Sequence, residues 1–408
     1  MRIVFEREKS LSAAHDRLSD SHINKPDLRE PMADIQGYDA SEAVGYHYGG
    51  FPPKRIDYER LAKPLTSATA ALARYDAKLE TLHNKELLLA PLRNAEAVVS
   101  SRIEGTIATL DEILKIQADA DGDDDDHAAY RQEAIEVYSY TRAVKHAQAL
   151  IDKGLPISSR LIREAHSRLL FFGRGADKAP GQFKRDQNYV ADKRNKKILF
   201  IPASVVALEP GIAELERFIH DESVEPLIQT AVMHAEFEAL HPFKDGNGRL
   251  GRMLIPLNLW QRQIIHAPHL YVSAAIEERR EEYVERLREV SLTGDWNLWI
   301  EFFLEILQRQ AVINMKITDG IGDLYGKMQI NFREVLNSQW APLALDYIFA
   351  KPIFRNSAFT SSAGIPSQTA HRMSRQLIDS GLLTVNEGAS GRRASLLSFQ
   401  PLLELVRN

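Results

Sequence analysis

Residues 241–252 read HPFKDGNGRLGR, and GNGRLG within them matches the dinucleotide-binding pattern G-x-G-x-x-G. That pattern binds a dinucleotide only where a strand precedes the glycines and an acidic residue follows about 20 positions later. Here the preceding apolar residues recur with a helical period, and the later segment HAPHLYVS has no carboxylate. No G-K-[ST] follows, so the P-loop pattern is absent too. The stretch, which we call the signature segment, predicts a helix that ends at His241 and a second that begins near Asn247.

The loop of the signature segment is suited to binding phosphate. Backbone N–H groups at Gly246, Asn247 and Gly248, with a helix N-terminus behind them, form a cradle for an anion. Arg249 and Arg252 lie one turn apart and can reach a further phosphate with two hydrogen bonds each. These residues therefore predict a site for a nucleoside triphosphate.

Three more residues of the segment complete the predicted chemistry. Asp245 can hold the magnesium ion that a triphosphate brings, because Mg²⁺ prefers one or two carboxylates plus phosphate oxygens. His241 can take a proton from an incoming hydroxyl near neutral pH. Phe243 is predicted to be the apolar peg that holds the loop to the core. The alternative is a plain helix-loop-helix corner, which needs neither the two arginines nor the acid.

The segment resembles the Fic family signature H-x-F-x-[D/E]-G-N-G-R-x-x-R and matches it at every fixed position. The resemblance implies transfer of AMP from ATP, with Mg²⁺, to a Ser, Thr or Tyr hydroxyl of a target protein, which can be the protein itself. It implies that His241 is the catalytic base and Asp245 the metal ligand. The nucleotide-binding residues it implies are Phe243, Gly246, Asn247, Gly248, Arg249 and Arg252. Because both glycines are intact, the sequence favours AMP transfer over the phosphate transfer of the Doc-type variant.

The stretch NYVADKRNKKILFIP, residues 188–202, has apolar ends around a basic middle and predicts a β-hairpin. It resembles the flap that aligns a target segment by strand addition in the Fic family. The resemblance assigns to this flap Asn188, Tyr189, Val190, Leu199, Phe200 and Ile201. An ordinary surface hairpin is the alternative.

The stretch AVVSSRIEGT, residues 97–106, resembles the inhibitory motif [S/T]-x-x-x-E-[G/N] of Fic proteins whose inhibitory helix precedes the core. Ser100 and Glu104 are four residues apart and share one helix face, and Gly105 is a typical helix C-terminal residue. The resemblance implies that Glu104 pairs with Arg252 and competes with the γ-phosphate. Two alternatives remain open: a solvent-facing glutamate, and a bifunctional enzyme in which Glu104 positions water for AMP removal.

The tail predicts a different kind of domain. Residues 341–408 hold seven Lys and Arg against four Asp and Glu, although the whole chain has a net charge of -5. A helix that opens at Pro366-Ser367 and then a hairpin with Arg392 and Arg393 near its tip have the order of a winged helix-turn-helix. Such a tail serves as a DNA-binding or protein-docking module, and its recognition helix would present Gln368, Thr369, His371, Arg372 and Arg375. A DNA-binding regulator is therefore an alternative function.

The predicted fold class is mainly α, with a Fic-type helical bundle, a β-hairpin flap and a C-terminal winged helix-turn-helix domain. The expected divisions are an N-terminal arm of little regular structure (1–56), a helical region with the inhibitory motif (57–127), the Fic core (128–334) and the winged helix (335–408). The acidic run DADGDDDDH, which begins at Asp119, predicts a solvated loop.

The composition sets the remaining expectations. No stretch of the 408 residues resembles a signal peptide or a membrane span, and the chain has no cysteine, which fits a reducing cytoplasm. We therefore expect a cytoplasmic protein with no membrane partner, and a homodimer stays an open alternative.

Overall fold

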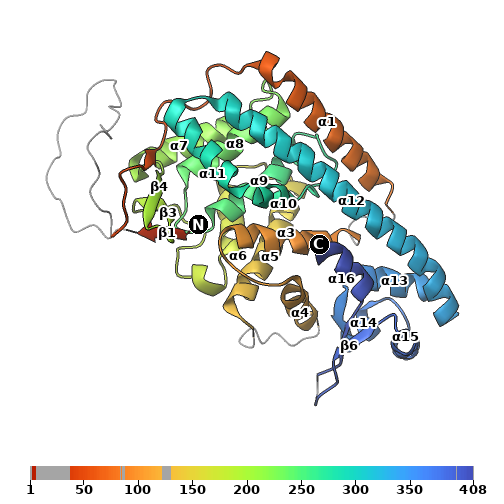
Figure 1. Ribbon diagram of the computed structural model, residues 1–408. Coiled ribbons are helices and arrows are strands. Elements are labelled where there is room, and N and C mark those ends of the chain that lie inside the picture. Colours follow the sequence, from red (N-terminus) through yellow and green to blue (C-terminus); the bar gives the residue numbers. More distant parts are fainter. Residues whose placement is uncertain are drawn as a thin grey trace.

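The computed structural model describes residues 2–5, 37–82, 84, 88–121, 130–391 and 393–407. It is mainly helical, as predicted, with two small sheets (Figure 1). The helices are α1 (Tyr58–Glu80), α3 (Ala90–Ile103), α4 (Leu110–Ala120), α5 (Gln132–Asp152), α6 (Ser159–Leu169), η2 (Gly173–Gly175), α7 (Val205–Ile219), α8 (Pro226–Leu240), α9 (Asn247–Gln261), α10 (Ser273–Glu278), α11 (Arg280–Thr293), α12 (Trp296–Leu336), α13 (Ala341–Ala350), α14 (Asn356–Ser362), α15 (Ser367–Asp379) and α16 (Gln400–Arg407). The strands are β1 (Arg2–Phe5), β2 (Val44–Gly45), β3 (Asn188–Asp192), β4 (Lys197–Ile201), β5 (Ile353–Arg355), β6 (Thr384–Glu387) and β7 (Leu396–Ser398).

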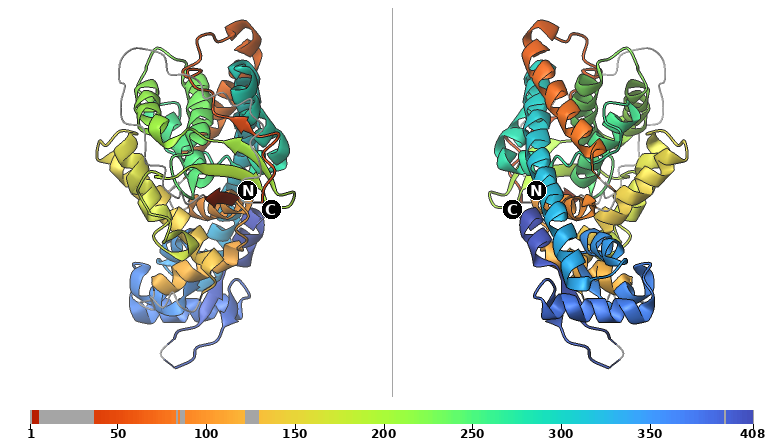
Figure 2. Two further views of the ribbon diagram at one scale, coloured as in Figure 1. Left: turned by 90° about the vertical axis from the view of Figure 1, so that its left-hand side faces the viewer. Right: turned by 90° about the vertical axis from the view of Figure 1, so that its right-hand side faces the viewer.

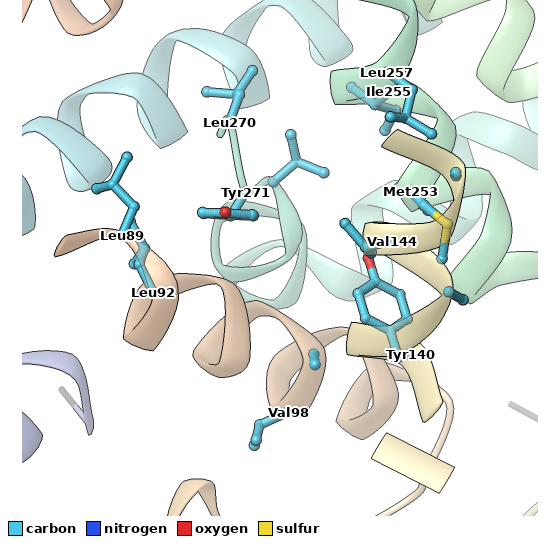
Figure 3. Packing of buried hydrophobic residues seen from close by; sticks show 14 of the residues in the cluster. Leu89, Leu92, Val98, Tyr140, Val144, Met253, Ile255, Leu257, Leu270 and Tyr271 are labelled. Atoms are coloured by element: carbon cyan, nitrogen blue, oxygen red, sulfur yellow. The ribbon is translucent and has the colours of Figure 1, made fainter. Parts of the chain in front are cut away.

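Helix α8 is the centre of the fold. Nearly all of its residues are buried, because α7, α9, α11 and α12 pack around it. Helix α9 follows after a short loop, so the signature segment joins two helices of the core, as predicted. Helix α3 lies across α5 and α9 and is fixed there by apolar side chains. Figure 3 shows this part of the core with Leu89, Leu92, Val98, Tyr140, Val144, Met253, Ile255, Leu257, Leu270 and Tyr271 labelled.

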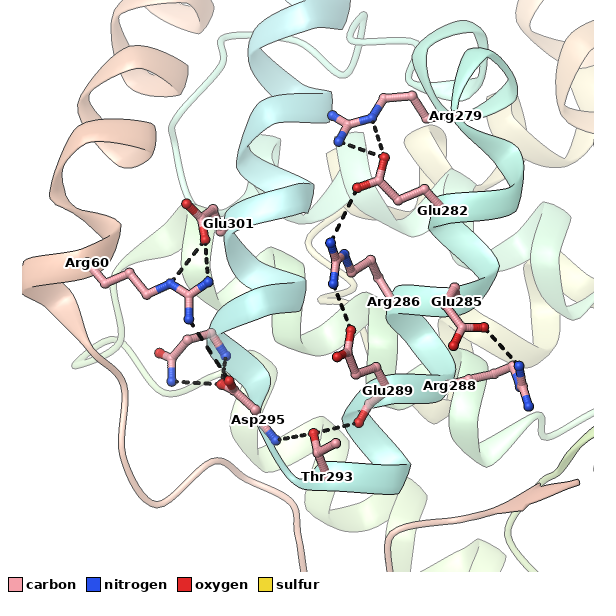
Figure 4. Close-up of polar contacts among 11 residues, drawn as sticks. Arg60, Arg279, Glu282, Glu285, Arg286, Arg288, Glu289, Thr293, Asp295 and Glu301 are labelled. Carbon is pink, nitrogen blue, oxygen red and sulfur yellow. Dashed lines mark hydrogen bonds and ion pairs between the residues drawn. The ribbon is translucent and has the colours of Figure 1, made fainter. Parts of the chain in front are cut away.

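Helices α1 and α12 lie side by side along one edge of the molecule and run in the same direction (Figures 1 and 2). Ion pairs link Arg60 to Glu301 near their starts and Lys78 to Asp319 further along. Figure 4 shows the first of these pairs beside a chain of ion pairs on the exposed face of α11. Exposed pairs of this kind contribute about 0–1 kcal/mol each. The residues of α11 that are buried are Tyr283 and Val290.

The predicted hairpin of residues 188–202 is present as β3 and β4. It belongs to a four-stranded sheet of order β1-β3-β4-β2. Two short strands lie in residues 1–56, where little regular structure was expected: β1 pairs antiparallel with β3, and β2 pairs parallel with β4. Short strands that complete a sheet from a distant segment have no alternation long enough to be read from sequence. Residues 6–36 lie outside the described residues.

The tail folds as α13, β5, α14, α15, β6, β7 and α16, with a sheet of order β5-β7-β6. The predicted helix at Ser367 and the hairpin after it are both present, and Arg392 lies outside the described residues. The expected boundary near residue 335 falls at the end of α12, which runs to Leu336. The tail lies against α3, α4 and the last turns of α12 at the lower end of the molecule in Figure 1.

Much of the positive charge of the tail is used to hold it against α4. Lys351 binds Asp121, and Arg407 binds Asp111. Arg355 and Arg393 both bind Asp119, whose side chain is only 1% exposed. The interpretation of the acidic run as solvated is therefore wrong at Asp119, because distant arginines neutralise this carboxylate. Residues 122–127 of the run lie outside the described residues.

No helix in the described ranges combines the length and the apolar character that a bilayer span requires. Helix α12 is long enough, but charged residues recur along it.

Candidate active site

The signature segment adopts a tight loop that is held by its own side chains. Asn247 accepts a hydrogen bond from Phe243 N and donates one to Phe243 O, both at 2.8 Å. Gly246 has φ 81°, a left-handed conformation that favours glycine, and it caps α9. The side chain of Asn247 thus holds the loop in place, and its backbone N–H is among the first amides of α9.

Phe243 is the buried peg that the sequence predicted. It is 0% exposed and stacks on His166 of α6, with ring centroids 3.7 Å apart. His166 also bonds Asp245 O at 2.9 Å and accepts from Gly181 N at 2.8 Å, so it ties the loop to α6 and to the segment before the hairpin. Burial lowers the pKa of His166 to about 4, which keeps this ring neutral. The sequence analysis missed His166, since no motif contains it.

His241 caps the C-terminus of α8 in a left-handed conformation, with φ 46° and ψ 61°. Its Nδ1 lies 3.3 Å from Glu238 O, which favours the tautomer with the proton on Nδ1. Nε2 is buried and has no hydrogen-bond partner among the described residues, and His241 lines a pocket. Burial, then the charge of Lys184, lowers the pKa of His241 to about 4. A neutral imidazole with a free Nε2 lone pair is a competent proton acceptor.

The pocket in front of His241 has a volume of about 350 Å³. Its floor is the start of α9, where Gly246 offers no side-chain cap for the first amides of the helix. Arg249 reaches it from α9 and is 3% exposed, with Nε and Nη1 unpaired among the described residues. Its apolar wall comes from the hairpin and from α11, including Val190, Phe200 and Leu287. An anion with an apolar group attached fits these surroundings.

Glu104 projects into the same pocket from the end of α3. Its Oε1 accepts a hydrogen bond from Arg252 Nη2 at 3.0 Å, and Ser100 binds the same guanidinium through Oγ at 3.0 Å and through its carbonyl at 2.8 Å. Burial raises the pKa of Glu104, but the nearby positive charges, Arg252 foremost among them, together outweigh burial and the net shift is downward. Glu104 is therefore a carboxylate ion at neutral pH.

Two glycines let Glu104 take this position. Gly105 has φ 85° and ends α3, with Thr106 N bonded to Ser101 O and Gly105 N to Arg102 O. A Cβ on Gly248 would lie 2.2 Å from Glu104 Oε1. The carboxylate thus covers the first turn of α9, where a phosphate group would also approach.

Acidic groups surround the remaining side of the pocket. The Asp245 side chain is 44% exposed, with Oδ1 3.5 Å from Arg249 Nη2 and 2.6 Å from Gly246 N. Glu136 of α5 also lines the pocket, and burial raises its pKa. Burial raises the pKa of Glu238 to about 8, so this buried carboxyl is protonated at neutral pH. The sequence analysis missed Glu136 and Glu238, which lie outside any spacing that it tested.

The structure divides the six residues assigned to the flap. Val190, Leu199 and Phe200 line the pocket. Tyr189 and Ile201 belong to a separate apolar cluster on the other face of the sheet. Asn188 begins β3, but its side chain is fully buried and donates to His241 O and Phe243 O. A polar residue at a strand start has no sequence signal that tells which way it faces.

The fold and the pocket together define a class of protein. It is mainly helical and brings a histidine, His241, and two arginines, Arg249 and Arg252, together at the N-terminal end of a buried helix, α9. Two family models match the chain, the Fic/DOC family N-terminal model over residues 62–149 and the Fic/DOC family model over residues 156–259. The chain belongs to the Fic/DOC family.

Relatives and solved structures agree with this assignment. The chain is 25% identical over 230 residues to Protein adenylyltransferase Fic of Drosophila ananassae, an alignment that covers 52% of this chain and 43% of the relative. It is 30% identical over 159 residues to the protein of the same name from Drosophila persimilis, covering 38% and 28%. The chain thus spans less than half the length of these relatives. A Fic family protein from Desulfovibrio desulfuricans G20 has a similar fold, with a TM-score of 0.53 and 19% identity over 85% of this chain and 98% of that one.

Proposed function

We propose that the protein transfers AMP from ATP to a Ser, Thr or Tyr hydroxyl of a target protein. The observation that carries the proposal is His241, whose buried Nε2 has no partner among the described residues and which lines a pocket floored by the N-terminus of α9. The relatives named above are adenylyltransferases, which supports the same reaction class.

The residues of the pocket account for each step of this transfer. His241 Nε2 removes the hydroxyl proton, the hydroxyl oxygen attacks the α-phosphorus, and the bond from that phosphorus to the pyrophosphate oxygen breaks. The first amides of α9 hold the α-phosphate, while Arg249 and Arg252 neutralise the leaving pyrophosphate. Since nucleotidyl transfer requires mainly positioning and charge stabilisation, these groups suffice.

Asp245 fits the role of magnesium ligand. Its carboxylate is partly exposed at the pocket, and Oδ2 has no hydrogen bond to any described residue that competes with a cation. The described residues contain no cluster of three or more His, Cys, Asp or Glu side chains around one point. A nucleotide-bound Mg²⁺ needs only one or two protein carboxylates, since phosphate and water complete its shell. The ion would supply charge neutralisation on the phosphates.

We further propose that Glu104 inhibits this transfer. In support, Glu104 occupies Arg252 and lies over Gly248, so the carboxylate and the γ-phosphate compete for the same guanidinium. The bifunctional alternative, in which Glu104 positions water for AMP removal, has one observation in its favour: Glu104 and His241 line the same pocket. Incubation of AMP-modified target with the protein and Mg²⁺, without ATP, tests it through release of AMP.

A second candidate function, DNA binding by the tail, has a specific observation behind it. Helix α15 leaves Gln368, His371, Arg372 and Arg375 exposed on one side. Neither Arg372 nor Arg375 makes an ion pair with a described residue, whereas Arg393 is held by Asp119. A mobility-shift assay with random duplex DNA should therefore compare the parent with an Arg372→Ala, Arg375→Ala variant. No shift at low salt would exclude this function.

The main proposal is tested by incubating the protein with ATP labelled on the α-phosphate, Mg²⁺ and lysate. Modified peptides are then identified by mass spectrometry. Attachment of AMP to a hydroxyl side chain, absent with His241→Ala, is the expected result. AMP transfer would be rejected if the peptides carried phosphate alone. It would also be rejected if a Glu104→Gly variant that binds ATP attached no AMP to any peptide.

A further inference from the structure

A buried lysine and a buried asparagine hold the backbone on both sides of His241. Lys184, which is 2% exposed, donates from Nζ to Leu240 O at 3.1 Å and from its backbone N to Pro242 O at 2.8 Å. Asn188 donates from Nδ2 to His241 O at 3.1 Å and to Phe243 O at 3.0 Å. Four successive carbonyls, 240 to 243, thus accept hydrogen bonds from these two residues.

The two residues are also joined to each other. Lys184 Nζ donates to Asn188 Oδ1 at 2.7 Å, which orients the amide so that its Nδ2 faces the loop. Asn188 is the first residue of β3, so this link connects the hairpin that walls the pocket to the loop that carries His241. A shift of the hairpin would therefore move the backbone of His241.

The local backbone explains why such a clamp is needed. The last carbonyls of a helix have no partner within the helix, and buried ones require donors from elsewhere. His241 also adopts a left-handed conformation, which is disfavoured for a residue with a side chain. Burying a lysine is unfavourable, and burial lowers the pKa of Lys184 to about 7. Its position in the core therefore requires compensation, which the loop carbonyls provide.

We propose that Lys184 and Asn188 are positioning residues for the transfer reaction, which fix the His241 imidazole in front of the nucleotide. The inference rests on the proposed function. Neither residue needs to touch ATP or target, because both act through the backbone of residues 240–243.

Lys184 also acts on His241 through its charge. The charged groups that influence His241 are Lys184, which lowers its pKa, and Glu104 and Asp245, which raise it. At the acid pH where His241 titrates, Lys184 is fully protonated, since its own pKa of about 7 is higher. Removing this cation favours the imidazolium form, so the pKa of His241 should rise.

The experiment uses the full chain carrying Glu104→Gly, so that transfer is measured without Glu104. In this background, Lys184→Met should lower kcat about 10²-fold, since a displacement of about 1 Å has an effect of this size. The dissociation constant for ATP should change less than about twofold, because the phosphate-binding amides are not altered. The acid limb of the pH profile should move up by about one pH unit. Lys184→Arg keeps a charge and two or more donors, and should restore most of the rate and the parent profile.

Lys197→Met is the matched control. Lys197 lies in the hairpin that Asn188 begins, and its side chain is 42% exposed and paired with Glu42, so its loss should change neither kcat nor the pH profile. In an active background, an unchanged kcat and an unchanged profile with Lys184→Met would overturn the inference.

A measurement that does not depend on activity separates this inference from the proposed function. The pKa of His241 can be followed by NMR in histidine-labelled protein, where Lys184→Met should raise it. Lys184→Gln also removes the cation but keeps a hydrogen-bond donor; it should raise the His241 pKa as well, and it serves if Lys184→Met fails to fold. An unchanged His241 pKa in a folded variant would reject the positioning role of Lys184 and Asn188. If the Glu104→Gly protein itself transfers no AMP, only the proposed function is rejected.

Discussion

Replacing Glu104 by glycine should release Arg252 for the nucleotide and raise AMP transfer, including self-modification. The structure sets the size of the effect. One charge-assisted hydrogen bond, Arg252 Nη2 to Glu104 Oε1 at 3.0 Å, is lost, and the side chains are 1% and 24% exposed, so solvent screens the pair weakly. Such a bond contributes about 1.5–3 kcal/mol. If this free energy opposes nucleotide binding in the productive position, its removal raises the rate roughly 10- to 150-fold.

The assay measures initial rates of label transfer from ATP at saturating target and several ATP concentrations. Glu277→Gln is the matched control, because Glu277 pairs with Arg102 of the same helix α3 but does not line the pocket. Its exposed ion pair contributes about 0–1 kcal/mol, so its loss should leave the rate within about twofold of the parent. Equal initial rates for Glu104→Gly and the parent would refute the inhibitory role. Equal stimulation by Glu277→Gln would show that loosening α3, rather than freeing Arg252, is responsible.

The remaining predictions concern the base, its pH dependence and the tail. In the Glu104→Gly background, His241→Ala should lower the transfer rate about 10²–10⁴-fold, while ATP binding measured by calorimetry persists. If the double variant transfers AMP as fast as Glu104→Gly alone, another group is the base. The pKa of His241 is lowered to about 4, so the base is neutral above that pH. The transfer rate should therefore stay level from pH 8 to about pH 5.5 and fall at lower pH. A fall in the rate centred near pH 6.5 would contradict this lowered pKa. Asp119→Ala removes the buried carboxylate that Arg355 and Arg393 share, while Arg355 keeps its second partner, Glu387. The loss of these charge-assisted hydrogen bonds should reduce the free energy of unfolding by about 1.5–3 kcal/mol in a urea titration. Asp111→Ala, which removes an exposed pair, should change it by at most about 1 kcal/mol.

Local patterns in the sequence were sufficient for the core of the candidate site. The helical period before His241 and the glycines after it predicted the end of α8, the loop and the start of α9, because each depends on residues within a few positions. The end of α3 at Gly105 follows from the same local rule, since glycine adopts the left-handed conformation there without strain. The β3–β4 hairpin was predictable for the same reason.

Contacts between distant segments were not predictable in this way. Asn188 is polar and begins a strand, which is compatible with a surface flap, yet it is buried against the loop at Phe243. The tail has an excess of positive charge, which indicated a separate domain, yet Asp119 lies where α4 meets the tail and binds Arg355 and Arg393. Charge totals record how many cations a segment has, and not which of them are neutralised by another part of the chain.

The sequence by itself determined the mainly helical class and the local structure of the signature segment, because helix periodicity, capping and loop geometry are set by near neighbours along the chain. Only the tertiary structure decided which groups surround that segment: Glu104 over Gly248, and Lys184 and Asn188 on the carbonyls around His241. Those contacts join residues separated by 53 or more positions, such as Asn188 and His241. Packing of the whole core brings them together, and no periodicity in the chain encodes a pairing over such a separation.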